Sequence, residues 1–323
     1  MNQLRQNLSR VAPFAILLLV LLAAAVIEPQ FYDVANLGNV ARGAAFLAVV
    51  ALGQLMVIIV RGLDLSVGAV ITATLLLVVE LAGTRNGSIP LALVAVVGMS
   101  LAVGVLNATL VVFRRVPAIL ATLATFVLVD GVGLWLTQGR SRGRVPDLIK
   151  PLGTGTVAGI PVAVIVAAVL AVAVAVLLGR MRFGRAMYAV GANPDASYLA
   201  GVPRRRVAAL AFVASSVLAM VAGLMLSGYV GFYDRTIGVG YDLDSIAAAI
   251  LGGASFAGGV GTVAGTMAAV VGLAALDNLL LVAGVGPAVQ LIGKGLVLFV
   301  AVLSAGLLSA RPAEVSQPTH QTA

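Results

Sequence analysis

The chain has 323 residues, of which 61% are hydrophobic and 10% charged, and its mean hydropathy is +1.12. Soluble domains are about 45–50% apolar and about 25% charged, so this composition excludes a soluble globular protein and predicts a polytopic membrane protein. The net charge is +8, but the arginines stand in short clusters beside apolar segments, as membrane topology requires, so we expect no nucleic-acid binding. The absence of cysteine and the single histidine, His320, exclude thiol catalysis, cysteine-held metals and histidine-dependent catalysis.

Apolar segments in the first half of the chain predict five membrane spans. The first, at residues 11–27, follows a basic N-terminus and is not followed by a small-residue cleavage site, so we expect a retained span with a cytoplasmic N-terminus. The polar loop at 28–41 is then expected outside, and the second span at 43–60. A glycine-rich polar cluster around Asp64 and Ser66 interrupts the next apolar run and predicts a broken helix before the third span at 67–82. The fourth and fifth spans are predicted at 89–113 and 117–137.

The second half contains the longest polar interval and five further apolar segments. Residues 138–160 form that interval, on the expected outer side, and they carry Arg140, Arg142, Arg144 and Lys150. A protein-docking surface and a solvated loop are both open for this segment. Spans are predicted at 161–178, 207–228, 245–257, 263–283 and 287–308, the third of them short. The total of about ten spans puts the polar tail 311–323 in the cytoplasm, and more Lys and Arg residues fall on the inner side than on the outer side.

The central polar stretch, residues 180–206, separates the two apolar halves and contains the strongest local helix signals. Asn193 can cap a helix, Pro194 suits its first position, and a carboxylate at Asp195 interacts favourably with the positive end of the helix dipole. Gly201 can end the helix in the left-handed conformation, and Pro203 cannot continue it. A helix at 194–200 is too short to be stable alone, so we predict that it is held between the membrane body and a partner docking from the cytoplasm. The alternative is an ordinary connecting loop.

The two apolar halves resemble each other in sequence. Residues 106–118 align without a gap to residues 276–288, matching Leu106 with Leu276 and Pro117 with Pro287. The shift corresponds to five spans, and an odd number of spans reverses direction, so we predict inverted repeats of the kind that many transporters use. The predicted fold is therefore all-α: one transmembrane domain at residues 1–310, with halves at about 40–160 and 207–308 around the central stretch.

Three ionisable residues fall inside predicted spans, namely Asp130, Asp277 and Lys294. Charged groups in the membrane are costly and are usually paired or exposed to water. All three lie at similar depth near the outer side, so we predict that Lys294 pairs with Asp277 or, failing that, with Asp130. Both a structural role and a substrate-contacting role are open for this pair.

Other polar residues recur near the predicted breaks and inside the spans. Their hydrogen-bonding groups suit either hydroxyl-rich solutes or contacts between helices, so they are candidates for a translocation path or for the helix break. These residues are Gln54, Asp64, Ser66, Asn107, Asn278 and Gln290. Neither lysine lies in a phosphate-binding loop, so ATP is not bound by that route. We expect no catalytic residue, metal or cofactor.

Three motifs resemble those of one transporter family: RGLDLSVGAV at 61–70, GANPDASYLAGVPRRRV at 191–207 and LDSIAAAILGGASFAGGVGTVAGT at 243–266. They are similar to the permease subunits of bacterial ABC importers for simple sugars of the ribose, xylose, arabinose and galactose type, over about residues 10–308. At the position before Gly62 this family usually has another glycine, whereas this chain has Arg61.

The resemblance implies an inner-membrane permease of about ten spans that pairs with a second copy or a paralogue. It implies docking onto a cytoplasmic ABC ATPase, delivery of a pentose or hexose by an extracytoplasmic sugar-binding protein, and import by alternating access. The residues expected to meet the ATPase are Gly184, Gly191, Asn193, Pro194, Asp195, Ala200, Gly201 and Pro203.

Other substrates and two other classes of membrane protein are also open. Within the importer class, the substrate could instead be a nucleoside, a sugar-derived signal or a branched-chain amino acid. An ion-coupled secondary transporter would also use inverted repeats and intramembrane charges, but without an ATPase. A membrane scaffold would bind partners without moving a solute.

Overall fold

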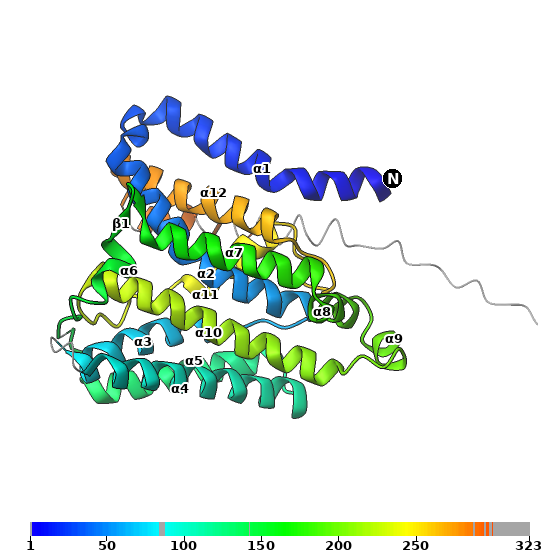
Figure 1. Ribbon diagram of the computed structural model, residues 1–323. Coiled ribbons are helices and arrows are strands. Elements are labelled where there is room, and N and C mark those ends of the chain that lie inside the picture. The colour runs from blue at the N-terminus through cyan, green and yellow to red at the C-terminus, as the bar shows by residue number, and fades with distance from the viewer. Residues whose placement is uncertain are drawn as a thin grey trace, which may run out of the picture.

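The computed structural model describes residues 2–83, 88–141, 143–286, 288–293, 295–296 and 299, and within them the chain is a bundle of roughly parallel and antiparallel helices (Figure 1). The first half comprises α1 (Asn2–Ile27), the short helix η1 (Pro29–Tyr32), α2 (Val34–Ile59), α3 (Val67–Ala82), α4 (Ile89–Ala108), the π-helical turn η3 (Thr109–Phe113) and α5 (Ala118–Thr137). The second part comprises α6 (Lys150–Thr154), the hairpin of β1 (Thr156–Val157) and β2 (Ile160–Pro161), α7 (Val162–Arg180), α8 (Arg182–Ala192), α9 (Pro194–Leu199), α10 (Arg204–Val230), α11 (Tyr241–Leu251) and α12 (Val263–Val282).

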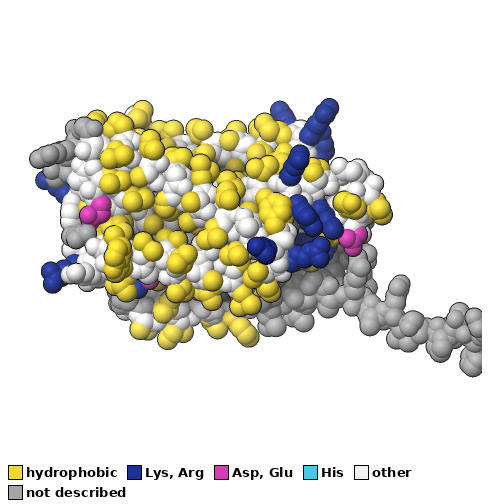
Figure 2. Space-filling view, turned by 90° about the horizontal axis from the view of Figure 1, so that it is seen from below, with side chains coloured by type: hydrophobic (Ala, Val, Ile, Leu, Met, Phe, Trp, Pro, Cys, Tyr) yellow, Lys and Arg dark blue, Asp and Glu magenta, His cyan; other side chains and the backbone are white. Residues whose placement is uncertain are grey.

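Helix α2 is the centre of the bundle. Its residues from Ala44 to Ile59 are all buried and, apart from Gln54, apolar on every side, and α2 packs against α7, α10, α11 and α12. By contrast, α4, α5 and α7 are also strongly apolar, but only about a quarter of the residues in their apolar segments are buried. Figure 2 shows such hydrophobic side chains over one face of the molecule. An exposed apolar surface of this extent is stable against lipid tails and not against water.

Six helices of the described residues are long and apolar enough to cross a membrane: α2, α4 with η3, α5, α7, α10 and α12. The shorter apolar stretches are Pro13–Ile27 of α1 and the whole of α3. A crossing needs about 20 residues, so α3 with 16 and α11 with 11 span the bilayer only together with the non-helical segments beside them. The predicted all-helical membrane fold is confirmed.

Glycines allow the closest helix contacts in the bundle. A Cβ atom at Gly53 of α2 would lie 2.9 Å from the Cα of Ser215, and one at Gly104 of α4 would lie 2.7 Å from the Cα of Val213. Helix α10 therefore touches α2 and α4 backbone to backbone. Small residues at such crossings are the usual means of tight packing between membrane helices.

The structure corrects several predicted boundaries. The expected outer loop at 28–41 is wrong, because α2 begins at Val34 and Phe31 of η1 is fully buried. Asn36 ties this helical extension to Asn278 of α12, although Val34 and Leu37 in the extension are exposed. The short span predicted at 245–257 is helical earlier, from Tyr241 to Leu251. The tenth span at 287–308 is described only in part, and the tail 311–323 lies outside the described residues.

The polar interval 138–160 is also more ordered than a solvated loop. The amide of Val145 donates to the carbonyl of Gly231 at 2.9 Å, and Val145 and Ile149 are buried. Gly153 of α6 packs directly on the backbone of Gly228 and Tyr229 of α10. The segment thus lies on the end of the bundle opposite α8 and α9 (Figure 1).

Arginines gather at the end of the molecule that carries α8 and α9 (Figure 2). Within the described part of the chain, the arginines at this end are Arg61, Arg114, Arg115, Arg180, Arg182, Arg185, Arg204, Arg205 and Arg206. Such an excess of cations at one end of the spans is typical of the cytoplasmic side.

Candidate coupling and translocation sites

The predicted short helix of the central stretch is present as α9, and its caps form as expected. The Asn193 side-chain oxygen accepts from the amides of Asp195 at 3.1 Å and Ala196 at 3.0 Å, and Pro194 occupies the first helical position. Gly201 follows the helix with φ of +78°. A capping side chain of this kind contributes about 1 kcal/mol, which stabilises a helix that is otherwise too short.

Helix α9 is tied to the start of α10. Arg204 donates to Asp195 at 3.0 Å, and its guanidinium lies 5.2 Å from the centre of the Tyr198 ring. A cavity of about 450 Å³ opens between the two helices, and Leu199 beside it is 85% exposed. The cavity is lined by Tyr198, Gly201, Val202, Pro203, Arg204, Arg205 and Arg206. An exposed leucine beside a basic cavity is a surface suited to a partner protein with an acidic rim.

Helix α8 joins this tip to the membrane body through two glycines without space for a side chain. A Cβ atom at Gly184 would lie against the last turn of α7, and one at Gly191 would lie against the carbonyl of Ile59 and the amide of Gly259. The Tyr188 hydroxyl donates to the carbonyl of Gly261 at 2.8 Å. Helix α8 therefore contacts the end of α2 and the glycine-rich segment 252–262 together.

The break between α2 and α3, residues 61–66, is stabilised by a buried polar cluster. Oδ1 of Asp64 accepts from the amide and hydroxyl of Ser66 at 3.0 and 2.6 Å. The side-chain amide of Asn107 donates to the Ser66 hydroxyl at 2.8 Å. The Gln54 side-chain amide is oriented so that it bonds to both backbone groups of Asp64. It donates to the Asp64 carbonyl at 3.1 Å and accepts from the Asp64 amide at 3.2 Å. All four residues are fully buried, so the cluster replaces the helical hydrogen bonds that the break removes.

Helix α5 adds a further contact to the same break. The Thr122 hydroxyl accepts from the amide of Leu65 at 3.1 Å and donates to its own helix at Ala118. Four of the six polar residues predicted for the path or the break, Gln54, Asp64, Ser66 and Asn107, thus lie together at the break.

The other two predicted polar residues, Asn278 and Gln290, line a separate pocket of about 350 Å³ that also contains Asp277. The remaining lining residues are Gly43, Leu47, Val239, Tyr241, Asp244, Ala274 and Leu281. Asn278 exchanges hydrogen bonds with Asn36 at 2.7 and 3.0 Å, which joins α12 to the start of α2. Carboxylate, amide and phenol groups beside an apolar wall are the chemistry that a hydroxyl-rich solute needs.

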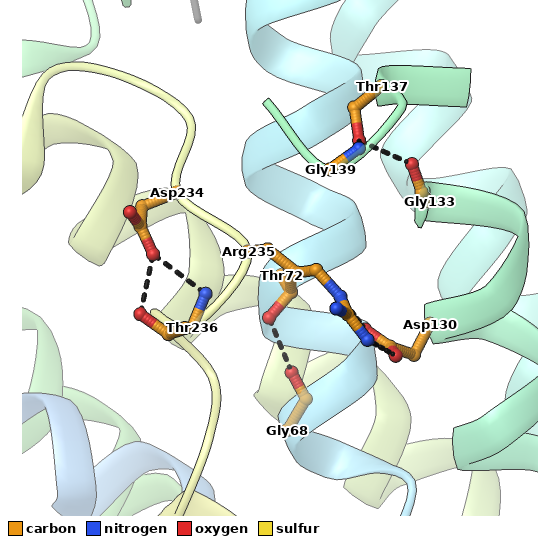
Figure 3. A network of polar contacts seen from close by, with 9 residues as sticks. All are labelled: Gly68, Thr72, Asp130, Gly133, Thr137, Gly139, Asp234, Arg235 and Thr236. Carbon is orange, nitrogen blue, oxygen red and sulfur yellow. Dashed lines mark hydrogen bonds and ion pairs between the residues drawn. The ribbon is translucent and has the colours of Figure 1, made fainter. Parts of the chain in front are cut away.

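The structure gives Asp130 an arginine partner. Asp130 of α5 is bound by Arg235, whose Nη2 and Nε donate to its two carboxylate oxygens at 2.6 and 3.2 Å (Figure 3). The pairing of Lys294 with Asp277 or, failing that, with Asp130 stays a prediction. Asp277 lies in the pocket just described, and Lys294 lies outside the described residues.

Arg235 reaches Asp130 because the segment between α10 and α11, residues 231–240, turns into the bundle. The amide of Gly238 donates to the Thr72 hydroxyl of α3 at 3.2 Å, and Gly238 and Gly68 pack backbone to backbone. The Thr236 hydroxyl and amide both bond to Asp234, and these bonds hold the pKa of the Asp234 carboxyl below its usual range. Figure 3 shows this inward segment beside α3 and α5. Asp130 itself gave a sequence signal, whereas its partner lay in an expected outer loop.

The Asp130–Arg235 pair leads to a prediction about charge balance. Arg235→Ala leaves the Asp130 carboxylate without this partner beside apolar surroundings, so we expect a several-fold loss of correctly folded protein in the membrane. Asp130→Asn combined with Arg235→Gln removes both charges and is expected to restore most of it. Size-exclusion profiles of fluorescently tagged protein in mild detergent measure both effects. A double variant no better than Arg235→Ala would contradict the pairing.

The described fold defines a polytopic α-helical membrane protein with broken helices and a short capped helix, α9, at its basic end. The family model described as "Branched-chain amino acid transport system / permease component" matches residues 36–302, and the chain belongs to this family. It is therefore a transport subunit, a multi-pass inner-membrane permease.

Curated relatives are similar over most of their length. The chain is 32% identical to the ribose import permease protein RbsC of Haemophilus influenzae, covering 92% of this chain and 93% of the relative. It is 32% identical to the RbsC protein of Bacillus subtilis, covering 92% of both. It is 32% identical to the autoinducer 2 import system permease protein LsrC of Yersinia enterocolitica, covering 86% of this chain and 76% of the relative. No solved structure matches the chain significantly.

Proposed function

We propose that this chain is the membrane permease of an ATP-driven importer that moves a simple sugar, a pentose or hexose, into the cytoplasm. Relatives named as ribose import permeases over nearly the whole chain support a sugar as substrate. The polar pocket of Asp277, Asn278 and Gln290 offers hydrogen-bonding groups suited to sugar hydroxyls. The LsrC relatives favour autoinducer 2, a signal, as the second candidate substrate.

The observation that carries the coupling to an ATPase is the placement of α9. This six-residue helix is capped at Asn193, is ion-paired through Asp195 and presents an exposed Leu199. Helix α8 directly precedes it in the chain and packs tightly against the end of α2 and the segment 252–262. A force applied to α9 by a partner therefore reaches both non-helical segments of the membrane domain.

The proposed mechanism is alternating access by rigid movement about these segments. Helices α3 and α11 are shorter than the membrane and end at breaks, so their angles can change without breaking helical hydrogen bonds. Docking of ATPase subunits on α9 would close and open the bundle end that bears α8. The halves at about 40–160 and 207–308 are proposed to be inverted repeats, because the alignment of residues 106–118 with 276–288 corresponds to a shift of five spans.

The proposed partners follow from the same arrangement. Cytoplasmic ABC ATPase subunits dock at α9 and its basic cavity, and an extracytoplasmic sugar-binding protein docks at the opposite end around residues 138–160. A second copy or a paralogue of the chain completes the translocation path, and both termini lie in the cytoplasm. The exposed apolar faces of α4, α5 and α7 contact lipid or that second subunit.

The test is uptake into proteoliposomes that contain this chain and its ATPase, with binding protein and radiolabelled sugar outside and ATP inside. Ion gradients are collapsed with ionophores, and an ATPase variant unable to hydrolyse ATP is the matched control. We expect uptake that needs both binding protein and active ATPase, and a panel with ribose, other pentoses, hexoses and autoinducer 2 identifies the solute. Uptake that needs an ion gradient and proceeds without the ATPase would overturn the proposal, as would partner binding with no solute movement.

A further inference from the structure

Arg61 occupies a backbone position that normally requires glycine. Helix α2 ends with the amide of Arg61 donating to Ile58 at 2.9 Å and the amide of Gly62 donating to Val57 at 2.9 Å. These two bonds form the Schellman motif, in which the residue after the cap is left-handed and is usually glycine. Arg61 adopts φ of +67° there. A left-handed residue with a side chain is strained, and such strain persists where the surroundings impose it.

The side chain of Arg61 crosses from this position to the end of α8. Nε donates to the carbonyl of Gly191 at 2.6 Å, and Nη2 donates to the carbonyl of Ala192 at 2.9 Å. These are the last two residues of α8, whose carbonyls have no partner within the helix and carry the negative end of its dipole. A guanidinium with two donors in one plane suits this pair of acceptors, and the ammonium group of lysine cannot reproduce it.

The bridge lies where three segments of the chain meet. The amide of Gly259 donates to the carbonyl of Ile59, two residues before Arg61, and a Cβ atom at Gly258 would collide with the Arg61 side chain. Asn193, which caps α9, directly follows the two acceptor residues. The guanidinium therefore holds the connection between α8 and α9 against Arg61, the first residue of the break at 61–66.

We propose that Arg61 is a positioning residue that transmits movement of α8 and α9 to the break at 61–66. When a partner displaces α9, the two hydrogen bonds move the start of the break with the end of α8, and the cluster around Asp64 moves with it. This inference rests on the proposed ATP-driven import, because the movement that it transmits is attributed to the ATPase.

Substitution by glycine separates transmission from a purely structural role. Arg61→Gly relieves the backbone strain, so if Arg61 serves only to end α2 the variant is at least as stable and transports normally. If Arg61 transmits movement, the same variant keeps its stability but uses ATP without moving sugar. Arg61→Lys keeps the charge but loses the planar guanidinium. We therefore expect its sugar moved per ATP hydrolysed to lie between those of the wild type and Arg61→Gly.

Arg115 provides the matched control. It is an exposed arginine in the same arginine-rich end, with φ of +59°, and in the described part of the chain its side chain makes no hydrogen bond or ion pair. Arg115→Gly therefore relieves a similar strain and removes the same charge without cutting a bridge. We expect it to leave sugar moved per ATP unchanged.

The experiment measures sugar moved per ATP hydrolysed in the proteoliposomes described above, together with the melting temperature of each variant. We expect Arg61→Gly to lower the ratio by at least about fivefold, with a melting temperature equal to or above that of the wild type. A wild-type ratio in Arg61→Gly overturns the inference, and so does an equal loss in Arg115→Gly.

A second readout does not depend on transport. The chain has no native cysteine, so spin labels can be placed at Leu199→Cys on α9 and Ile119→Cys on α5, which are 85% and 50% exposed. We expect the distance distribution between the labels to broaden in Arg61→Gly and to stay unchanged in Arg115→Gly. An unchanged distribution in Arg61→Gly overturns the inference even where the wild type takes up sugar. If the wild type shows no ATP-dependent uptake but Arg61→Gly still broadens the distance distribution, the proposed function is overturned. The role of Arg61 in holding α8 to the break is then retained.

Discussion

Gly191→Ala is expected to reduce ATP-driven sugar uptake by about tenfold or more. The added methyl group has no space, because it would lie against the carbonyl of Ile59 and the amide of Gly259. Overpacking of this kind costs about 1–3 kcal/mol, and about 1.4 kcal/mol in the balance between two conformations already changes their ratio tenfold. The end of α8 must move away from the two breaks, so α9 loses its rigid connection to them.

The matched control for this change is Gly179→Ala. Gly179 lies near the end of α7, and a Cβ atom there would meet nothing within 4 Å. Helix propensity by itself favours alanine over glycine by about 1 kcal/mol at both positions, so propensity predicts a gain in stability for both. We expect normal uptake for Gly179→Ala. Transport by Gly191→Ala at the wild-type rate in the proteoliposome assay would contradict the prediction. It would show that close packing of α8 on the two breaks is not needed for transport.

Asp64→Leu is expected to destabilise the membrane domain by about 3 kcal/mol or more. Leucine cannot accept the hydrogen bonds that the amide and hydroxyl of Ser66 donate to Asp64 at 3.0 and 2.6 Å, nor the longer one from the Asn107 side chain at 3.4 Å. A buried donor that loses its acceptor costs about 1–3 kcal/mol, and this fully buried cluster has no solvent to replace the lost acceptor. Asp64→Asn keeps one oxygen acceptor and is expected to retain most of the stability.

Thermal unfolding in mild detergent, followed by size-exclusion chromatography after heating, measures this difference. Asp33→Leu is the matched control, because Asp33 is an exposed aspartate whose side chain makes no capping bond to α2. Surface changes of this kind usually shift stability by no more than about 0.5 kcal/mol. Equal melting temperatures for Asp64→Leu and Asp33→Leu would show that the cluster does not hold the break.

Local sequence signals predicted the features that depend on neighbours in the chain. The limits of α9 follow from Asn193, Pro194 and Gly201, whose effects act within one turn of a helix. The spans follow from apolar runs of sufficient length, and the break at 61–66 follows from glycine and polar residues within such runs. The start of α2 was misplaced because the polar residues at 34–42 suggested a loop, whereas a contact with α12 makes them helical.

The sequence by itself determined the class of the protein, its long helices and the short capped helix α9, because hydrophobicity and capping are properties of short segments. The tertiary structure decided which distant groups meet: Arg61 with Gly191 across 130 residues, Arg235 with Asp130 across 105, and the separation of Asn278 and Gln290 from the cluster around Asp64. Such contacts depend on how whole helices pack and where an interhelical segment turns inward, and in a chain rich in leucine, valine and alanine many packings satisfy the same hydrophobic pattern.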